Sequence, residues 1–170
     1  GDFRKAYATP QIVTVGGQPL LVSLGSMAAY GYDPLTGREI WRIEERSNFS
    51  ASTRPVAGYG LVFVPTGWST GQLLAIRPDG RGDATGTHVA WRVTQGVPKK
   101  PSLLLSGDLL FMVNDVGIAT CLEAKTGAVV WKARVTGEYS ASPLLAGGRI
   151  YFFNEDGKTT VIEAGREFKV

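Results

Sequence analysis

Two residue types that often carry chemistry occur once each in this chain. Its 170 residues include one histidine, His88, and one cysteine, Cys121. One imidazole cannot form a metal site with several histidine ligands, and His88 stands just before Trp91 on an expected outer strand, where we predict a surface position. Cys121 fills a small-residue position of a repeated motif, which favours a buried structural thiol over a nucleophile. A single cysteine also excludes an internal disulfide.

The turn that precedes Trp91 carries charged residues in a glycine-rich setting. It contains Arg81-Gly82-Asp83, a tripeptide that could indicate adhesion, and the pair Asp79 and Asp83, which could indicate calcium. The spacing lacks the alternating ligands of a calcium loop, and a solvated turn rich in glycine and aspartate accounts for the same residues. We therefore predict no metal ligands and no catalytic residues.

Aromatic, hydroxyl and basic residues recur where short apolar runs begin. Residues 49–52 (FSAS) and 139–142 (YSAS) match each other, residues 7–10 (YATP) are a shorter version, and Lys99-Lys100 takes the aromatic position in between. Such side chains could bind a glycan, a peptide or an anionic group. Alternatively the aromatic residue plugs the turn, which is the interpretation we favour. The candidate binding face consists of Tyr7, Phe49, Ser50, Lys99, Lys100, Tyr139 and Ser140.

The overall composition is that of one globular domain. Hydrophobic residues make up 44% and charged residues 19% of the chain, and its 22 glycines and 9 prolines lie between short apolar runs, which is typical of an all-β fold. The formal net charge is +3 but the basic residues are scattered, so we predict no nucleic-acid partner. The longest apolar runs are too short to cross a bilayer, so we predict no membrane span.

Two distant segments share one pattern. In GYDPLTGREIW (31–41) and CLEAKTGAVVW (121–131) an acidic residue stands three positions before a Thr-Gly pair, and a tryptophan follows the glycine by four. The acidic side chain can accept hydrogen bonds from turn amides and the glycine tolerates a positive φ. Each segment is therefore predicted to be a β-hairpin that ends in a buried tryptophan.

The two hairpins belong to four repeated units. Each unit opens with a proline and a short apolar run, and the prolines Pro10, Pro55, Pro101 and Pro143 lie 45, 46 and 42 positions apart. Two more apolar strands and the tryptophan strand follow, and this period is typical of a β-propeller. We predict one all-β domain, 1–170, with four-stranded antiparallel blades at about 9–46, 52–95, 99–136 and 141–170.

The hairpin pattern resembles the docking motif of the PQQ-like propeller repeats, in the quinoprotein alcohol dehydrogenase-like superfamily. That resemblance implies that the motif docks each blade on the next. Trp68 lies in a turn outside the repeat register, so we predict that it is exposed. Blade two departs by a longer turn with Arg77 in the acidic position, and blade four keeps Glu163 but has Phe168 as the expected substitute for tryptophan. The implied docking residues are Asp33, Gly37, Trp41, Trp91, Glu123, Gly127 and Trp131.

The resemblance also sets the functional alternatives. In the dehydrogenases it would imply PQQ in the central channel, a calcium ion, an aspartate base and a disulfide of adjacent cysteines, and that set is not recognisable in this sequence. We predict a non-catalytic scaffold or binding module without a cofactor, which takes a protein or glycan partner. The alternative is a PQQ-dependent dehydrogenase or a fragment of one. The family favours a periplasmic or extracellular location.

The number of blades is itself a prediction. Propellers of this family usually have seven or eight blades, and four blades in an open arc would expose the apolar faces of the two terminal blades. The alternatives are a tight four-bladed ring, a pair of arcs that form a larger ring, or a longer chain with further blades, which we favour. An arc alone is expected to self-associate.

Overall fold

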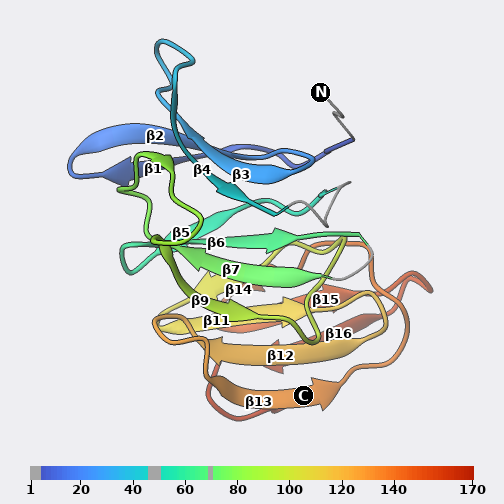
Figure 1. The fold of residues 1–170 in the computed structure, drawn as a ribbon. Helices are drawn as coiled ribbons and strands as arrows, with labels where there is room; N and C mark the ends of the chain where they lie inside the picture. Colours follow the sequence, from blue (N-terminus) through green and yellow to red (C-terminus); the bar gives the residue numbers. More distant parts are fainter. Residues whose placement is uncertain (1–4, 46–50, 69–70) are drawn as a thin grey trace.

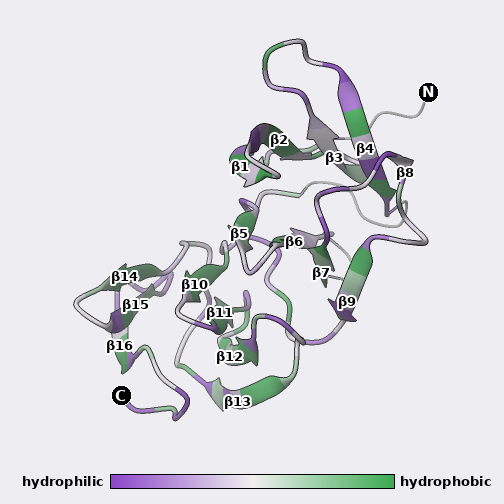
Figure 2. Ribbon diagram, turned by 90° about the vertical axis from the view of Figure 1, so that its left-hand side faces the viewer, coloured by the Kyte–Doolittle hydropathy of each residue, from purple (hydrophilic) through white to green (hydrophobic). Residues whose placement is uncertain are grey.

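The structure, a computed structural model, describes residues 5–45, 51–68 and 71–170. Within these residues, sixteen strands form four sheets and no helix is present, so none could cross a membrane. The sheets follow one another from the N-terminal to the C-terminal end of the chain (Figure 1). They fan out as an open arc, with the first strand of each sheet on the concave side (Figure 2). The predicted all-β fold of propeller blades is confirmed.

The first sheet departs from four antiparallel strands. Its order is β1-β2-β3-β4-β8, and the fifth strand comes from the long turn of the second unit. Gly82 and Asp83 pair in parallel with Trp41 and Arg42 of β4. The strands are β1 (Gln11–Val15), β2 (Gln18–Leu24), β3 (Ala28–Tyr32), β4 (Glu39–Glu44) and β8 (Gly82–Asp83).

The second and third sheets are four-stranded and antiparallel. The second contains β5 (Val56–Gly58), β6 (Leu61–Thr66), β7 (Gln72–Ile76) and β9 (Val89–Val93). The third contains β10 (Leu104–Ser106), β11 (Leu109–Val113), β12 (Ile118–Glu123) and β13 (Val129–Arg134). Because both sheets are covered on both sides, every residue of β6 and β11 is buried.

The fourth sheet has three described strands, β14 (Leu144–Ala146), β15 (Arg149–Phe153) and β16 (Thr159–Glu163), where four were predicted. The Glu163 N–H donates to the Lys169 carbonyl at 3.0 Å, as the Glu123 N–H does to Ala128 at 2.8 Å before β13. Phe168 is therefore a turn residue. Its ring lies 5.2 Å from the ring of Trp131 in the preceding sheet, so the prediction that it substitutes for a tryptophan is wrong.

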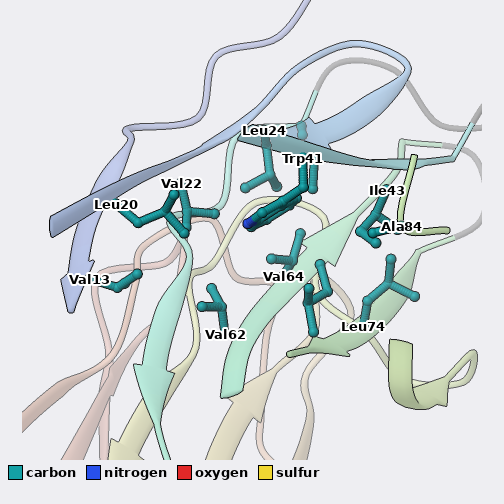
Figure 3. Packing of buried hydrophobic residues seen from close by; sticks show 13 residues of the cluster. Val13, Leu20, Val22, Leu24, Trp41, Ile43, Val62, Val64, Leu74 and Ala84 are labelled. Carbon is teal, nitrogen blue, oxygen red and sulfur yellow. The ribbon is translucent and has the colours of Figure 1, made fainter. Parts of the chain in front are cut away.

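The core consists of clusters between neighbouring sheets. Between the first and second sheets, Val22 and Trp41 of one sheet meet Val64 and Leu74 of the other (Figure 3). Alternate residues of β2 face this cluster because side chains alternate along a strand, and Leu20, Val22 and Leu24 are buried. The other two junctions are built in the same way.

One hydrogen bond recurs at every junction. Each repeat tryptophan donates its indole N–H to a backbone carbonyl in the turn of the next sheet. Trp41 is fully buried, as predicted for its hairpin, whereas Trp91 and Trp131 are half-buried, so the prediction of a buried tryptophan at the end of the second hairpin, Trp131, is corrected. The bonds join Trp41 to Pro78 at 2.9 Å, Trp91 to Ala124 at 3.2 Å and Trp131 to Gly165 at 3.0 Å.

A small residue lies opposite each of these indoles. A Cβ atom on Gly31 would lie 2.3 Å from Trp41 Cε2, so the first sheet has no space for a side chain there. Cys121 is a buried free thiol, as predicted, and burial raises its pKa to about 12, so it is protonated and unreactive at neutral pH. The register pairs are Gly31 with Trp41, Ala75 with Trp91 and Cys121 with Trp131.

Candidate functional site

The connections into β5, β10 and β14 lie at one end of the sheets, together with the turns at residues 114–117 and 154–157. We call this end the entry face. The two turns have the same construction: Asn114 Oδ1 accepts from the Ile118 N–H at 2.8 Å, and Asn154 Oδ1 accepts from the Lys158 N–H at 2.7 Å. Each asparagine is followed by an acidic residue, Asp115 or Glu155. The repeat thus brings two carboxylates to the entry face.

The predicted lysines meet these carboxylates. The backbone N–H of Lys99 donates to Asp115 Oδ2 at 2.9 Å. Lys100 Nζ lies 3.1 Å from Glu155 Oε1 and 3.9 Å from Asp115 Oδ1, so it bridges the third and fourth sheets. Ser140 Oγ also donates to Glu155, and this bond, followed by Lys100, holds the pKa of Glu155 below its ordinary value. Glu155 is therefore ionised at neutral pH.

Hydroxyl groups continue this network along the concave side. Ser52 Oγ donates to the Lys99 carbonyl at 2.9 Å. The Arg54 N–H donates to Ser102 Oγ at 3.0 Å, and the Ser102 N–H donates to Ser142 Oγ at 3.0 Å. These residues stand directly before β5, β10 and β14. The entry segments of three sheets are therefore fixed to one another by side-chain hydrogen bonds.

The predicted aromatic residues do not form a common surface. Tyr139 is fully buried, its hydroxyl donates to the Thr136 carbonyl at 3.0 Å, and its ring packs edge-on against Phe152. It fills the turn, so the prediction that Tyr139 belongs to the binding face is wrong. Tyr7 is 63% exposed, and its N–H donates to the Ala51 carbonyl at 2.7 Å. Phe49 and Ser50 lie outside the described residues.

The remaining candidates are Lys99, Lys100, Ser140 and Tyr7. The structure brings the first three together with Asp115 and Glu155, which were not predicted. A signal for both acids is visible in the sequence, because NDVG (114–117) and NEDG (154–157) repeat 40 positions apart. The structure therefore assigns a mixed-charge cluster, not an aromatic platform, to the entry face.

The opposite end of the sheets, the turn face, carries the hairpin turns with the acidic motif position. Asp33 accepts from the N–H groups of Leu35 at 2.9 Å and Thr36 at 3.2 Å, and the Leu35 bond is the main reason why the pKa of Asp33 lies below its ordinary value. Gly37 closes this turn with its N–H 2.9 Å from the Asp33 carbonyl, at a φ of 72°. The predicted role of Asp33 in the turn agrees with this geometry.

Glu123 differs from Asp33 at the matching position. Its carboxylate pairs with Arg166 of the next sheet, which also contacts Asp108. The expectation that Glu123 binds turn amides is therefore corrected, because the longer side chain reaches across the junction. Gly127 approaches the neighbouring indole so closely that a Cβ atom would lie 2.7 Å from Trp91 Cε3.

A groove of about 540 Å³ opens on the turn face beside the first two sheets. Its walls include Val15, Pro34 and Pro78, with Asp79 and Arg81 from the long turn. This groove has no signal in the sequence, because it forms only where the long turn lies against the first sheet. The tripeptide at 81–83 is held there too, since Gly82 and Asp83 pair with β4.

The described residues offer no cluster of acidic, histidine or cysteine side chains for a calcium ion. Calcium takes about six to eight oxygen ligands, and the described part of the chain contains no group of three or more His, Cys, Asp or Glu residues that could hold a metal ion. His88 is half-buried, with Nδ1 2.8 Å from Thr87 Oγ1 and Nε2 3.7 Å from Asp79 Oδ1. We therefore derive no reaction step through a quinone.

Four stacked sheets linked by indole hydrogen bonds define an arc of a β-propeller. Residues 80–166 match the family described as "Outer membrane protein assembly factor BamB". The chain belongs to this family of PQQ-like propellers, as the sequence resemblance implied. No curated protein matches its sequence.

Solved structures show the same fold. BamB from Moraxella catarrhalis has a TM-score of 0.68 and 17% identity, over 96% of this chain and 43% of that protein. A europium-containing methanol dehydrogenase has a TM-score of 0.64 and 15% identity, over 92% of this chain and 38% of that protein. The computationally designed Ika4 protein has a TM-score of 0.61 and 12% identity, over 93% of this chain and 92% of that protein. The chain thus spans less than half of these two natural proteins.

Proposed function

We propose that this chain is a non-catalytic, protein-binding scaffold that acts outside the cytoplasm in outer membrane protein assembly. The family description supports a role in outer membrane protein assembly, and the entry face supports binding of a protein partner. The observation that carries the proposal is the bridge of Lys100 between Asp115 and Glu155. It presents charges of both signs from two sheets in a fixed arrangement, which suits a polar protein partner.

Docking of blades by the repeat tryptophans is part of this proposal. The three indole bonds link consecutive sheets, and large aromatic side chains supply much of the apolar area in such packing. The tryptophans would then hold the entry loops in register. A glycan partner gains no support, because Tyr139 is buried and offers no platform.

Site-specific photo-crosslinking tests the proposed contact. A photoreactive amino acid replaces exposed Ser140 on the entry face, and a second variant carries it at exposed Lys125 on the turn face as the matched control. Both variants are exported to the periplasm of a Gram-negative bacterium. We expect position 140 to capture a component of the outer membrane assembly machinery. Capture from position 125 alone, or from neither position, would overturn the proposal.

A second experiment addresses the dehydrogenase alternative. The purified chain is titrated with PQQ and calcium while quinone absorbance and dye-linked alcohol oxidation are followed. We expect neither a spectral shift nor turnover, because the carboxylates of Asp33, Glu155 and Glu123 are engaged in a turn and in ion pairs. A saturable absorbance shift would contradict the non-catalytic proposal, whatever the crosslinking shows.

A further inference from the structure

The groove on the turn face opens at the junction between the first and second sheets. Its lining includes Val15, Leu20 and Ile40, which belong to the apolar cluster of that junction or pack against it (Figure 3). Pro78 lines the groove from the turn of the second sheet. A Cβ atom on Gly16, another lining residue, would meet no atom of a residue beyond its chain neighbours within 4 Å. The turn-face groove is therefore open space at a junction inside the chain.

At the third junction, an arginine of the chain itself occupies the corresponding place. Arg166 comes from the turn of the fourth sheet and pairs with Glu123 and Asp108 of the third. Glu123 holds the motif position that Asp33 holds in the first sheet. Asp108 lies in the two-residue turn between β10 and β11, at the place that Gly17 has between β1 and β2. A cation of one sheet thus pairs with the acids of its neighbour.

The first junction carries an acid where the third carries this cation. Arg166 directly follows the residue whose carbonyl accepts the Trp131 indole bond, and at the first junction the corresponding position is Asp79. The Asp79 side chain is 70% exposed, and its Oδ1 lies 3.7 Å from His88 Nε2, beyond hydrogen-bond distance. The charge at this position is therefore reversed between the two junctions.

Two acidic side chains from different sheets line the turn-face groove. Asp33 belongs to the first sheet and Asp79 to the second. Asp33 accepts from two amides of its own turn, but an ionised carboxylate can accept about four hydrogen bonds. Arg81 also lines the groove, and its Nη1 donates to the Gly80 carbonyl at 2.8 Å, within its own turn. The groove thus combines an apolar lining with two carboxylates that can accept from a partner.

We propose that the turn-face groove binds an extended segment of a protein partner in which an arginine is flanked by apolar residues, with its guanidinium group paired with Asp33 and Asp79. The partner would supply from outside the charge that Arg166 supplies at the third junction. A guanidinium group presents five donors in one plane, so it can pair with two carboxylates. Its aliphatic stem and the flanking residues would cover Val15 and Ile40. The volume of about 540 Å³ lies within the range of ligand-binding clefts.

This inference does not rest on the proposed entry-face partner, because the groove opens at the opposite end of the sheets. Fluorescence anisotropy with the purified chain tests it. The probe is the labelled peptide Gly-Ser-Leu-Arg-Leu-Ser-Gly, and the control peptide has glutamine in place of arginine. We expect saturable binding of the arginine peptide that weakens as sodium chloride is added. The glutamine peptide should bind about tenfold more weakly, because it cannot form charge-assisted hydrogen bonds.

Variants of the chain locate the site. Asp79→Asn removes the charge from an exposed side chain and should weaken binding of the arginine peptide about tenfold. Asp156→Asn is the matched control, because it makes the same change in an exposed turn of the entry face, and it should bind like the original chain. Asp79→Arg places a guanidinium group where the third junction has Arg166. This variant should not bind the peptide, and its melting temperature should rise at low salt through a pair with Asp33.

The apolar lining is tested by Val15→Thr, which keeps the shape of the side chain and should weaken binding while the circular dichroism stays native. Absence of saturable binding by the arginine peptide would overturn the proposal. Equal affinity of the two peptides, or of Asp79→Asn and the original chain, would do the same. A loss for Asp156→Asn as large as that for Asp79→Asn would place the peptide on the entry face and also overturn it.

Discussion

The junction between the first and second sheets and the junction between the third and fourth use the same bond in different surroundings. Trp41 and Trp131 donate to turn carbonyls at 2.9 Å and 3.0 Å. Trp41 is nevertheless fully buried, whereas Trp131 is half-buried against Phe168. The repeat therefore determines the hydrogen bond, and the neighbouring turn determines how much of the indole is removed from water.

The first junction is covered by residues 82–85 of the long turn, which we call the clasp. The Ala84 N–H donates to the Arg42 carbonyl at 3.0 Å, and Thr85 Oγ1 accepts from the Glu44 N–H at 2.9 Å. Ala84 is buried in the same cluster as Trp41. At the third junction the corresponding contact is an exposed ion pair of Arg166 with Asp108 and Glu123. One junction is thus closed by backbone pairing and the other by surface charge.

The largest expected effect separates the two indoles. Trp41→Ala should reduce the free energy of unfolding by about 3–5 kcal/mol, the usual cost of deleting a buried aromatic side chain. Trp131→Ala should cost less, because part of that indole already contacts water. Urea denaturation followed by circular dichroism measures both. Equal losses would mean that burial by the clasp adds nothing to the first junction.

The positions opposite the indoles sharpen the comparison. Gly31→Ala should cost about 1–3 kcal/mol by overpacking, because the new Cβ would collide with Trp41. Cys121→Ala should be milder, since it only shortens a side chain in a site that already holds one. Alanine is the natural residue at the matching position of the second sheet, Ala75. A harmless Gly31→Ala would show that Trp41 can shift without loss.

A smaller effect tests the clasp directly. Thr85→Val keeps the shape of the side chain but removes both the acceptor for the Glu44 N–H and the donor to Asp83 Oδ1, so it should cost about 1–2 kcal/mol. Thr126→Val is the matched control, because Thr126 Oγ1 accepts only a 3.3 Å bond from Ala128 within its own exposed turn. The urea midpoint should decrease more for Thr85→Val than for Thr126→Val. The reverse order would remove the clasp as a stabilising element.

These contrasts also show which parts of the structure the sequence could predict. The hairpins, the small residue opposite each indole and the buried thiol follow from local patterns, because turn chemistry and strand alternation act within a few residues. Pairing of Gly82 with Trp41 joins residues far apart in the sequence, and no local pattern encodes it. Local patterns also do not show whether Tyr139 fills the turn or lies on a binding surface. Its contacts with Phe152 and the Thr136 carbonyl bury it in the turn.

The candidate site was predictable in part. The place of Lys99, Lys100 and Ser140 in the repeat indicates them, whereas Asp115 and Glu155 join them only because the third and fourth sheets stack side by side, which no local pattern encodes. The hairpin motif includes Glu123, but its carboxylate contacts Arg166 and not the turn amides that the motif predicts. The additional methylene group relative to Asp33 moves its carboxylate away from the turn amides and toward Arg166.

The ion pair at the third junction should have a weaker and salt-dependent effect. Arg166→Gln removes the charge between Asp108 and Glu123, whose hydrogen bonds raise the pKa of the guanidinium. Because the pair is exposed, we expect a small decrease in melting temperature at low salt that vanishes in concentrated sodium chloride. Thr85→Val should lose the same stability at both salt concentrations. A decrease for Arg166→Gln that persists in high salt would show that packing, not charge, closes this junction.

The smallest effect is expected at the tryptophan outside the repeat. Trp68 follows β6 and is 51% exposed, so half of its surface already contacts water in the folded chain. Trp68→Ala should therefore change the free energy of unfolding by no more than about 0.5 kcal/mol. Its fluorescence gives an independent measure, because removal of the most exposed indole should shift the remaining emission toward shorter wavelength. A loss of stability as large as that of Trp131→Ala would mean that Trp68 packs as firmly as a repeat tryptophan, and that position in the repeat does not determine which indoles hold the sheets together.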